Sequence, residues 1–267
     1  MNRLTAKNRE HLEHEGYLLV RGLLDWERDL RPVWEEYEGV LDRLIDDFIE
    51  AGEMSSRHED LPFGKRMTQA YQETGRVLSQ YFDCSLPQKG TREDSPIWVG
   101  PEVFNALSNP TLLDVVEDLI GPEIYSNPVQ HVRVKPPERT LPKNQHGAPI
   151  LGPTPWHQDN GVVTEDADDT NMLTVWFSLQ DTPIEKGPLY VVPRSHKKGL
   201  LTHCPGYHGN GTKLAGAEQI PEKIFAADRA IPLPVQPGDV IFLTRYTCLL
   251  YTSDAADDTP CVDLGGR

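Results

Sequence analysis

Residues 172–180 read MLTVWFSLQ, a run rich in β-branched and aromatic side chains that favours a β-strand. Similar short runs lie at 130–135, 188–192 and 240–246. Proline- and glycine-rich turns separate these runs, and no helical period of apolar residues lies between them. Short strands in this arrangement favour a β-sandwich or jelly roll over a parallel α/β sheet.

The first half of the chain has a helical pattern instead. Apolar residues recur at helical spacing over 30–49, and Gly52 follows them. A second helix is expected over 65–82. Asn109 as N-cap, followed by Pro110 at the first helical position, predicts the start of a third helix.

These patterns predict a mainly β fold with N-terminal helices and a β-sandwich or jelly roll as its core. A short strand is expected within 16–24 (GYLLVRGLL). We expect one domain over 1–247, helical in 1–121 and jelly-roll in 122–247. Residues 248–267 are expected to be a foreign or disordered tail.

Composition narrows the classes of partner. The net charge of -15, from 41 acidic against 26 basic residues, disfavours nucleic acid and anionic membrane surfaces. The four cysteines form no CxxC pair, which predicts neither a disulfide framework nor a structural zinc site. The N-terminus has no apolar signal core. We therefore expect a cytoplasmic protein that binds neither nucleic acid nor membrane; the sequence does not predict its oligomeric state.

The segment PWHQDN (155–160) contains a His-x-Asp motif. On an extended strand the period of two places His157 and Asp159 on one face, where both can reach a single metal. One further histidine would complete the facial triad of non-haem Fe(II) oxygenases. The motif alone is weak, because three-residue patterns recur by chance and a turn histidine beside a surface aspartate is the commoner case.

The order of several segments adds specificity to the motif. HVRVKPP (131–137), WHQD (156–159), LTVWFSLQD (173–181), GPLYVVPRSHKKG (187–199) and PGDVIFLTRYT (237–247) follow one another along the chain. Together they resemble the phytanoyl-CoA dioxygenase family of non-haem Fe(II)- and 2-oxoglutarate-dependent oxygenases. The resemblance spans most of the chain, from about residue 15 to residue 247. It implies a double-stranded β-helix, or cupin-like jelly roll, with helices packed against one sheet, and in this chain the jelly roll is expected to lack its last strand.

The resemblance implies hydroxylation of an unactivated C–H bond of a small organic molecule, with Fe(II), 2-oxoglutarate and O2. It implies that His157 and Asp159 are iron ligands. It also places Trp176, His131 and Lys135 around the 2-oxoglutarate site. Two simpler roles stay open: Trp176 as a core aromatic residue, and Lys135 as a solvated lysine at a strand end.

The same resemblance implies a third ligand, a histidine near position 249, where Leu249 stands. It also implies a later arginine that pairs with 2-oxoglutarate, and the neighbourhood of Pro260 offers none. The segment CLLYTSDAAD (248–257) looks like a translated sequencing adapter, so we expect the intact C-terminal part to be absent and the chain to be inactive or nearly so. The turn Arg194-Ser195-His196 is interpreted as structural.

Three alternatives stay open. Cys248 or Asp254 in a natural divergent tail would supply a metal ligand, although a thiolate suits other metal chemistry better. A non-enzymatic cupin-type binding module would use His157 and Asp159 for a structural metal or for none. A zinc-dependent hydrolase would also be served by His-x-Asp and one more histidine.

Overall fold

The computed structural model describes residues 4–76, 79–82, 100–127, 132, 140–143, 154–163, 169–207 and 213–251. The α-helices of this part are α1 (Ala6–Glu15), α2 (Arg31–Glu50), α3 (Phe63–Thr74), α4 (Ser79–Phe82), α5 (Pro101–Leu107) and α6 (Pro110–Ile120). The strands are β1 (Tyr17–Val20), β2 (Thr154–His157), β3 (Leu173–Phe177), β4 (Leu189–Val191), β5 (Cys204–Tyr207), β6 (Lys213–Gln219), β7 (Ile231–Leu233), β8 (Val240–Thr244) and β9 (Leu249–Tyr251).

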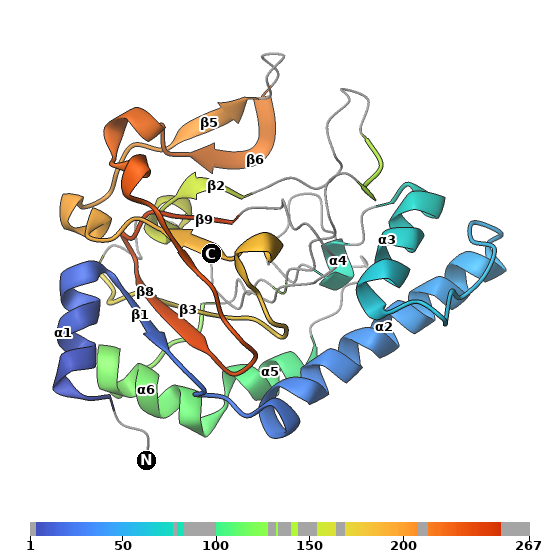
Figure 1. Cartoon of the computed structure of the whole chain (residues 1–267), viewed down its shortest axis with the longest axis horizontal. Helices are drawn as coiled ribbons and strands as arrows, with labels where there is room; N and C mark the ends of the chain where they lie inside the picture. Colours follow the sequence, from blue (N-terminus) through green and yellow to red (C-terminus); the bar gives the residue numbers. More distant parts are fainter. Residues whose placement is uncertain are drawn as a thin grey trace.

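Two antiparallel sheets form the core of the molecule. One has the order β1-β8-β3 and the other has the order β2-β9-β4-β7, while β5 and β6 form a separate pair. Helices α1, α5 and α6 lie along the outer side of the first sheet (Figure 1). The helices make the content mixed, so "mainly β" describes the core and not the whole chain.

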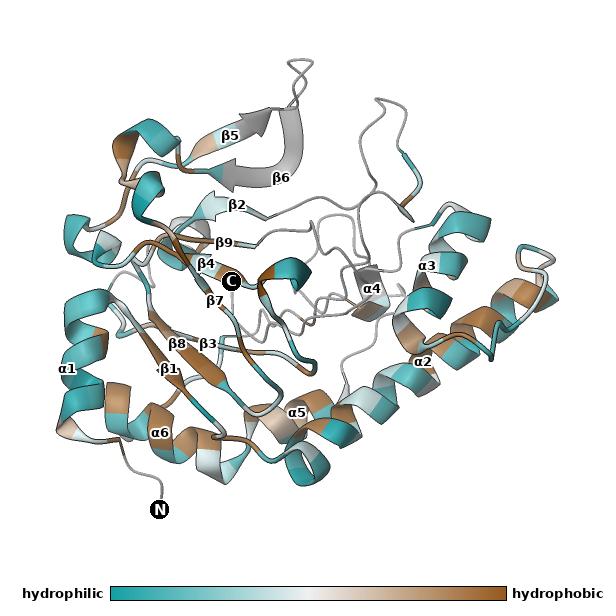
Figure 2. Cartoon of the chain, viewed as in Figure 1, coloured by the Kyte–Doolittle hydropathy of each residue, from teal (hydrophilic) through white to brown (hydrophobic). Residues whose placement is uncertain are grey.

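Strand β8 shows how the layers are held together. Its residues Val240 and Phe242 belong to the apolar cluster shared with the helices, whereas Ile241 and Leu243 belong to the cluster between the two sheets. All four side chains are fully buried, because both faces of the sheet are covered. Figure 2 shows the result as a continuous hydrophobic colour along β8.

The helices expected from periodicity and caps are present. Helix α2 buries the apolar stripe expected over 30–49. Helix α6 starts after Asn109, whose side chain accepts hydrogen bonds from the first backbone N–H groups. The helix expected over 65–82 is wrong in its extent, because Gly75 ends α3 in a left-handed conformation and α4 is a separate short helix.

Two helices were not expected from the sequence. Helix α1 is strongly polar and buries only Leu12, so its apolar stripe is too narrow to detect. Figure 2 shows it almost entirely in the hydrophilic colour. Helix α5 has seven residues, about two turns, which is too short for a periodic signal.

Strand β9 lies in the segment that the sequence analysis assigned to a tail. Residues 249–251 pair with β2 on one side and with β4 on the other. Strand β9 therefore lies inside the four-stranded sheet, between β2 and β4. The described residues do not show that this sheet lacks a strand. Residues 252–267 lie outside the described residues, so the expectation of a foreign or disordered tail stays a prediction for them.

Among the helices of the described residues, none combines the length and the apolar character that a membrane crossing requires.

Candidate metal-binding site

His157 and Asp159 lie at the end of β2, where the strand runs into a short 3-10 turn (Asp159–Val162). Both residues are almost completely buried, with exposed fractions of 8% and 7%. His157 Nε2 is 3.4 Å from Asp159 Oδ1. The two side chains therefore meet, as the alternation along a strand predicts; their role as metal ligands is not tested by this geometry and stays a prediction.

Hydrogen bonds orient both side chains. His157 Nδ1 lies 2.8 Å from the carbonyl oxygen of Pro155 and donates to it, so Nε2 is the ring nitrogen that faces Asp159. The hydroxyl of Thr174 donates to Asp159 Oδ2, and Oδ1 is the oxygen that faces the imidazole. Such outer partners are typical of metal-binding histidines and carboxylates.

The two donor atoms fit a divalent metal. A metal about 2.1 Å from a histidine nitrogen and a carboxylate oxygen requires the two atoms to lie roughly 3.0–3.4 Å apart, for bond angles of about 90–110°. The observed separation of 3.4 Å falls at the upper end of this range. The separation of the two atoms therefore fits two adjacent ligand positions on one metal.

Gln158, the residue between the two candidate ligands, holds the motif in place through hydrogen bonds of its side chain. The side chain of Gln158 is fully buried. Its Nε2 donates to the carbonyl oxygens of Gly199 and Tyr246 at 3.0 and 2.6 Å, and its Oε1 accepts from the N–H of Leu201 at 2.7 Å. This one amide links the motif to the loop after β4 and to the end of β8, a role that the sequence pattern did not indicate.

His203, a histidine of a long loop, also contacts the motif. Its Nε2 accepts from the backbone N–H of Gln158 at 3.0 Å, and its Nδ1 donates to Leu201 O at 2.9 Å. A Cβ on Gly161 would lie 2.1 Å from His203 Cε1, so this ring packs directly against the turn. The only sequence signal for this contact is the glycine, whose missing side chain makes room for the ring.

The position opposite His157 is apolar. In the register of β2 and β9, the Cα partner of His157 is Leu249. Residues directly opposite in an antiparallel pair present their side chains on the same face. Leu249 is 1% exposed and belongs to the cluster between the sheets. Accordingly, the described residues contain no group of three His, Cys, Asp or Glu side chains able to hold a metal.

Cys248 faces away from this position. It packs with Trp156 and Phe225 in the cluster on the other side of the sheet. Burial raises the pKa of its thiol, which disfavours the thiolate form that binds metals. Cys248 is therefore a poor third ligand in this structure, and Asp254 lies outside the described residues.

Trp176 lies in the same space between the sheets. The Tyr251 ring is 6.3 Å from the His157 ring and 6.4 Å from that of Trp176. The indole N–H of Trp176 is buried and has no hydrogen-bond acceptor among the described residues. His131 and Lys135, the other residues expected near 2-oxoglutarate, lie outside the described residues.

The turn around His196 has a different environment. Arg194 adopts a left-handed conformation with φ 65° and forms a bidentate ion pair with Glu15. His196 Nε2 contacts the carbonyl oxygen of Glu13 at 3.0 Å, and Ser195 Oγ accepts from the N–H of Cys248 at 2.8 Å. These contacts join the end of α1 to the sheet and support the structural interpretation of the turn.

The comparisons with known proteins agree with this architecture. A "Probable phytanoyl-CoA dioxygenase" of Caenorhabditis elegans is 23% identical over 255 residues, which cover 94% of this chain and 70% of that protein. A "1-deoxypentalenic acid 11-beta-hydroxylase" of Streptomyces arenae is 26% identical over 144 residues, or 53% of this chain and 47% of that protein.

The solved structure of the non-heme monooxygenase ThoJ is similar with a TM-score of 0.55 and 17% identity, over 96% of this chain and 74% of that one. Likeness at this identity shows the fold alone, which is the double-stranded β-helix with N-terminal helices. The model of the family described as "Phytanoyl-CoA dioxygenase (PhyH)" matches residues 12–248. The chain therefore belongs to the phytanoyl-CoA dioxygenase family of Fe(II)- and 2-oxoglutarate-dependent oxygenases.

Proposed function

We propose that this chain has the site of a hydroxylase that acts on an unactivated C–H bond of a small organic molecule. The observation that carries the proposal is the 3.4 Å approach of His157 Nε2 to Asp159 Oδ1 between the two sheets. Membership of the family supports the reaction class. The Streptomyces arenae relative, which is itself named as a hydroxylase, supports hydroxylation.

In this proposal His157 and Asp159 hold Fe(II). The iron, with 2-oxoglutarate and O2, supplies the oxidising chemistry that the side chains lack. The chain supplies orientation and a dry environment: the wall formed by Ile241, Leu243 and Leu249 is fully apolar and excludes water from the site.

The buried indole N–H of Trp176 supports its assignment to the 2-oxoglutarate site. A buried donor without an acceptor costs about 1–3 kcal/mol, and a carboxylate or keto oxygen of a bound co-substrate would remove that cost. We propose His131 and Lys135 as further residues of this site on the resemblance alone.

The second part of the proposal concerns activity. Two ligands bind a divalent metal less tightly than three, and the position facing His157 is taken by Leu249. We therefore expect the chain with this sequence to bind metal weakly and to turn over slowly. A non-enzymatic binding module is the alternative that this leucine favours.

The test is the substitution Leu249→His. We expect Mn(II) affinity, measured by calorimetry, to rise at least tenfold, because an imidazole then faces His157 from the paired strand. Fe(II)-dependent release of succinate from 2-oxoglutarate should rise in parallel. The matched control is Leu250→His, because Leu250 packs on the other side of the sheet and should bring no gain.

Equal Mn(II) affinity in the folded native chain and in Leu249→His would contradict the proposed site. Tighter metal binding without any succinate would favour the binding module. Turnover supported by zinc in a hydrolytic assay would favour the hydrolase.

A further inference from the structure

Thr174 stands out among the residues around the candidate site. It lies in β3, is 4% exposed, and donates its hydroxyl hydrogen to Asp159 Oδ2. Trp176, two residues further along the strand, is on the same face. The cross-strand partners of these two residues on β8 are Leu243 and Ile241, which are both apolar. Thr174 is thus a polar side chain in an apolar setting, with its hydroxyl directed at one carboxylate oxygen.

The hydrogen bond from Thr174 sets the orientation of the Asp159 carboxylate. The terminal torsion of an aspartate is broad, so the side chain alone does not select which oxygen faces the imidazole. With Oδ2 bonded to Thr174, Oδ1 is the atom that lies 3.4 Å from His157 Nε2. The β-branched threonine restricts its own first torsion, which limits the positions that Oγ1 can take.

We propose that Thr174 is a positioning residue, which orients Asp159 so that Oδ1 and His157 Nε2 share one metal ion. The inference rests on the proposed metal site and adds to it the group that sets its geometry. Thr174 touches neither metal nor substrate in this account, and it acts only through Asp159.

The variants Thr174→Val and Thr174→Ser separate positioning from simple stabilisation. Valine has nearly the same shape without the hydroxyl, whereas serine keeps the hydroxyl. We expect Co(II) affinity, titrated to millimolar concentration by calorimetry, to fall about 10- to 100-fold in Thr174→Val. The Co(II) affinity of Thr174→Ser should lie within about threefold of that of the native chain. The visible absorption of bound Co(II) should change in the valine variant and be restored in the serine variant.

The matched control is Thr182→Val. Thr182 is another buried threonine, whose hydroxyl contacts Ser178 and the carbonyl oxygen of Gln180. This control should lose thermal stability to an extent similar to Thr174→Val, with no change in Co(II) affinity. A purely structural Thr174 would behave in the same way as Thr182, and that result would overturn the inference.

The variants Asp159→Ala and His157→Ala distinguish a failure of the proposed metal site from a failure of the positioning role of Thr174. Should both bind Co(II) as the native chain does, or should the native chain bind none, the proposed metal site is wrong and the inference falls with it. Should both weaken binding while Thr174→Val leaves it unchanged, the metal site stands and the positioning role is wrong.

Discussion

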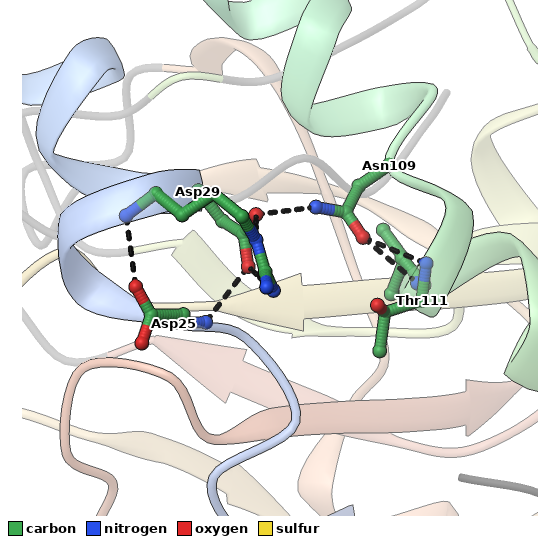
Figure 3. A network of polar contacts seen from close by, with 6 residues as sticks. Asp25, Asp29, Asn109 and Thr111 are labelled. Carbon is green, nitrogen blue, oxygen red and sulfur yellow. Dashed lines mark hydrogen bonds and ion pairs between the residues drawn. The ribbon is translucent and has the colours of Figure 1, made fainter. Parts of the chain in front are cut away.

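Asp29 and Asp159 are two buried aspartates with opposite surroundings. Asp29, 9% exposed, accepts from the backbone N–H of Asp25 at 2.8 Å, from Asn109 Nδ2 at 2.8 Å and from the guanidinium of Arg28 through two nitrogens (Figure 3). This ion pair, with the neighbouring hydrogen bonds, lowers the pKa of the Asp29 carboxyl. The network joins the π-helical turn Trp26–Leu30, which precedes α2, to the start of α6.

Asp159 is equally buried but has fewer donors. Its contacts among the described residues are the Thr174 hydroxyl on Oδ2 and the His157 imidazole near Oδ1. Asp239, a third buried aspartate, resembles Asp29, because both its oxygens accept backbone N–H groups and Arg21 pairs with one of them. The comparison suggests two roles for a buried carboxylate. One whose oxygens both accept several hydrogen bonds connects elements of the fold, whereas Asp159, whose Oδ1 faces only the His157 imidazole among the described residues, could still bind a metal through that oxygen.

The largest effect is expected at Asp29. Asp29→Ala leaves the Asn109 amide and the Asp25 N–H without their acceptor, and it removes the partner of Arg28. We expect a loss of about 3 kcal/mol in the free energy of unfolding, measured by urea denaturation. Asp29→Asn retains an acceptor and should lose less. A loss below about 1 kcal/mol in the alanine variant would contradict the structural role of Asp29.

The matched change at the site is Asp159→Ala. We expect the free energy of unfolding to fall by about 1 kcal/mol or less, because only the Thr174 hydroxyl loses a hydrogen-bond acceptor. Metal affinity should fall at least tenfold in the same variant. A stability loss as large as that of Asp29→Ala, with metal affinity unchanged, would make Asp159 a structural residue like Asp29.

The smallest effect is expected at Glu15, a carboxylate at the end of α1. Its hydrogen bond to Arg194 is the main cause that lowers the pKa of Glu15 to about 2, and His14 contributes. A depressed pKa means that the stabilisation is complete above the ordinary pKa of 4.5 and is lost as the pH falls toward 2.

Glu15→Gln should therefore cost at most about 1 kcal/mol at neutral pH, because Arg194 is largely exposed and the pair is screened by solvent. The difference between native chain and variant should vanish near pH 2, as measured by urea unfolding across the pH range. A difference that stays constant with pH would show that the ion pair contributes nothing.

Much of the fold follows from local sequence signals. The stripe of α2 and the cap at Asn109 are local features, and they predict α2 and the start of α6. The extent of the second helix was wrong, because Gly75 interrupts a pattern that otherwise continues. The unbroken apolar run of β8 indicates a strand covered on both faces, but it does not indicate which residues face the helices.

The candidate site is only partly accessible from sequence. His157 and Asp159 share a face because of a spacing of two, which is visible in the sequence. Thr174 and Leu249 lie beside His157 and Asp159 because of the packing of β3 and the pairing of β9. Strand register cannot be predicted from local sequence patterns. The role of Gln158 likewise depends on loops more than 40 residues away.

The central claim is that His157 Nε2 and Asp159 Oδ1 bind one metal ion. The most direct test is an anomalous difference map from crystals of the native chain soaked in Mn(II). We expect a single peak between the sheets, about 2.1–2.3 Å from both atoms and close to Leu249. A map with no peak beside these two atoms, or with Mn(II) bound to one of them alone, would contradict the account.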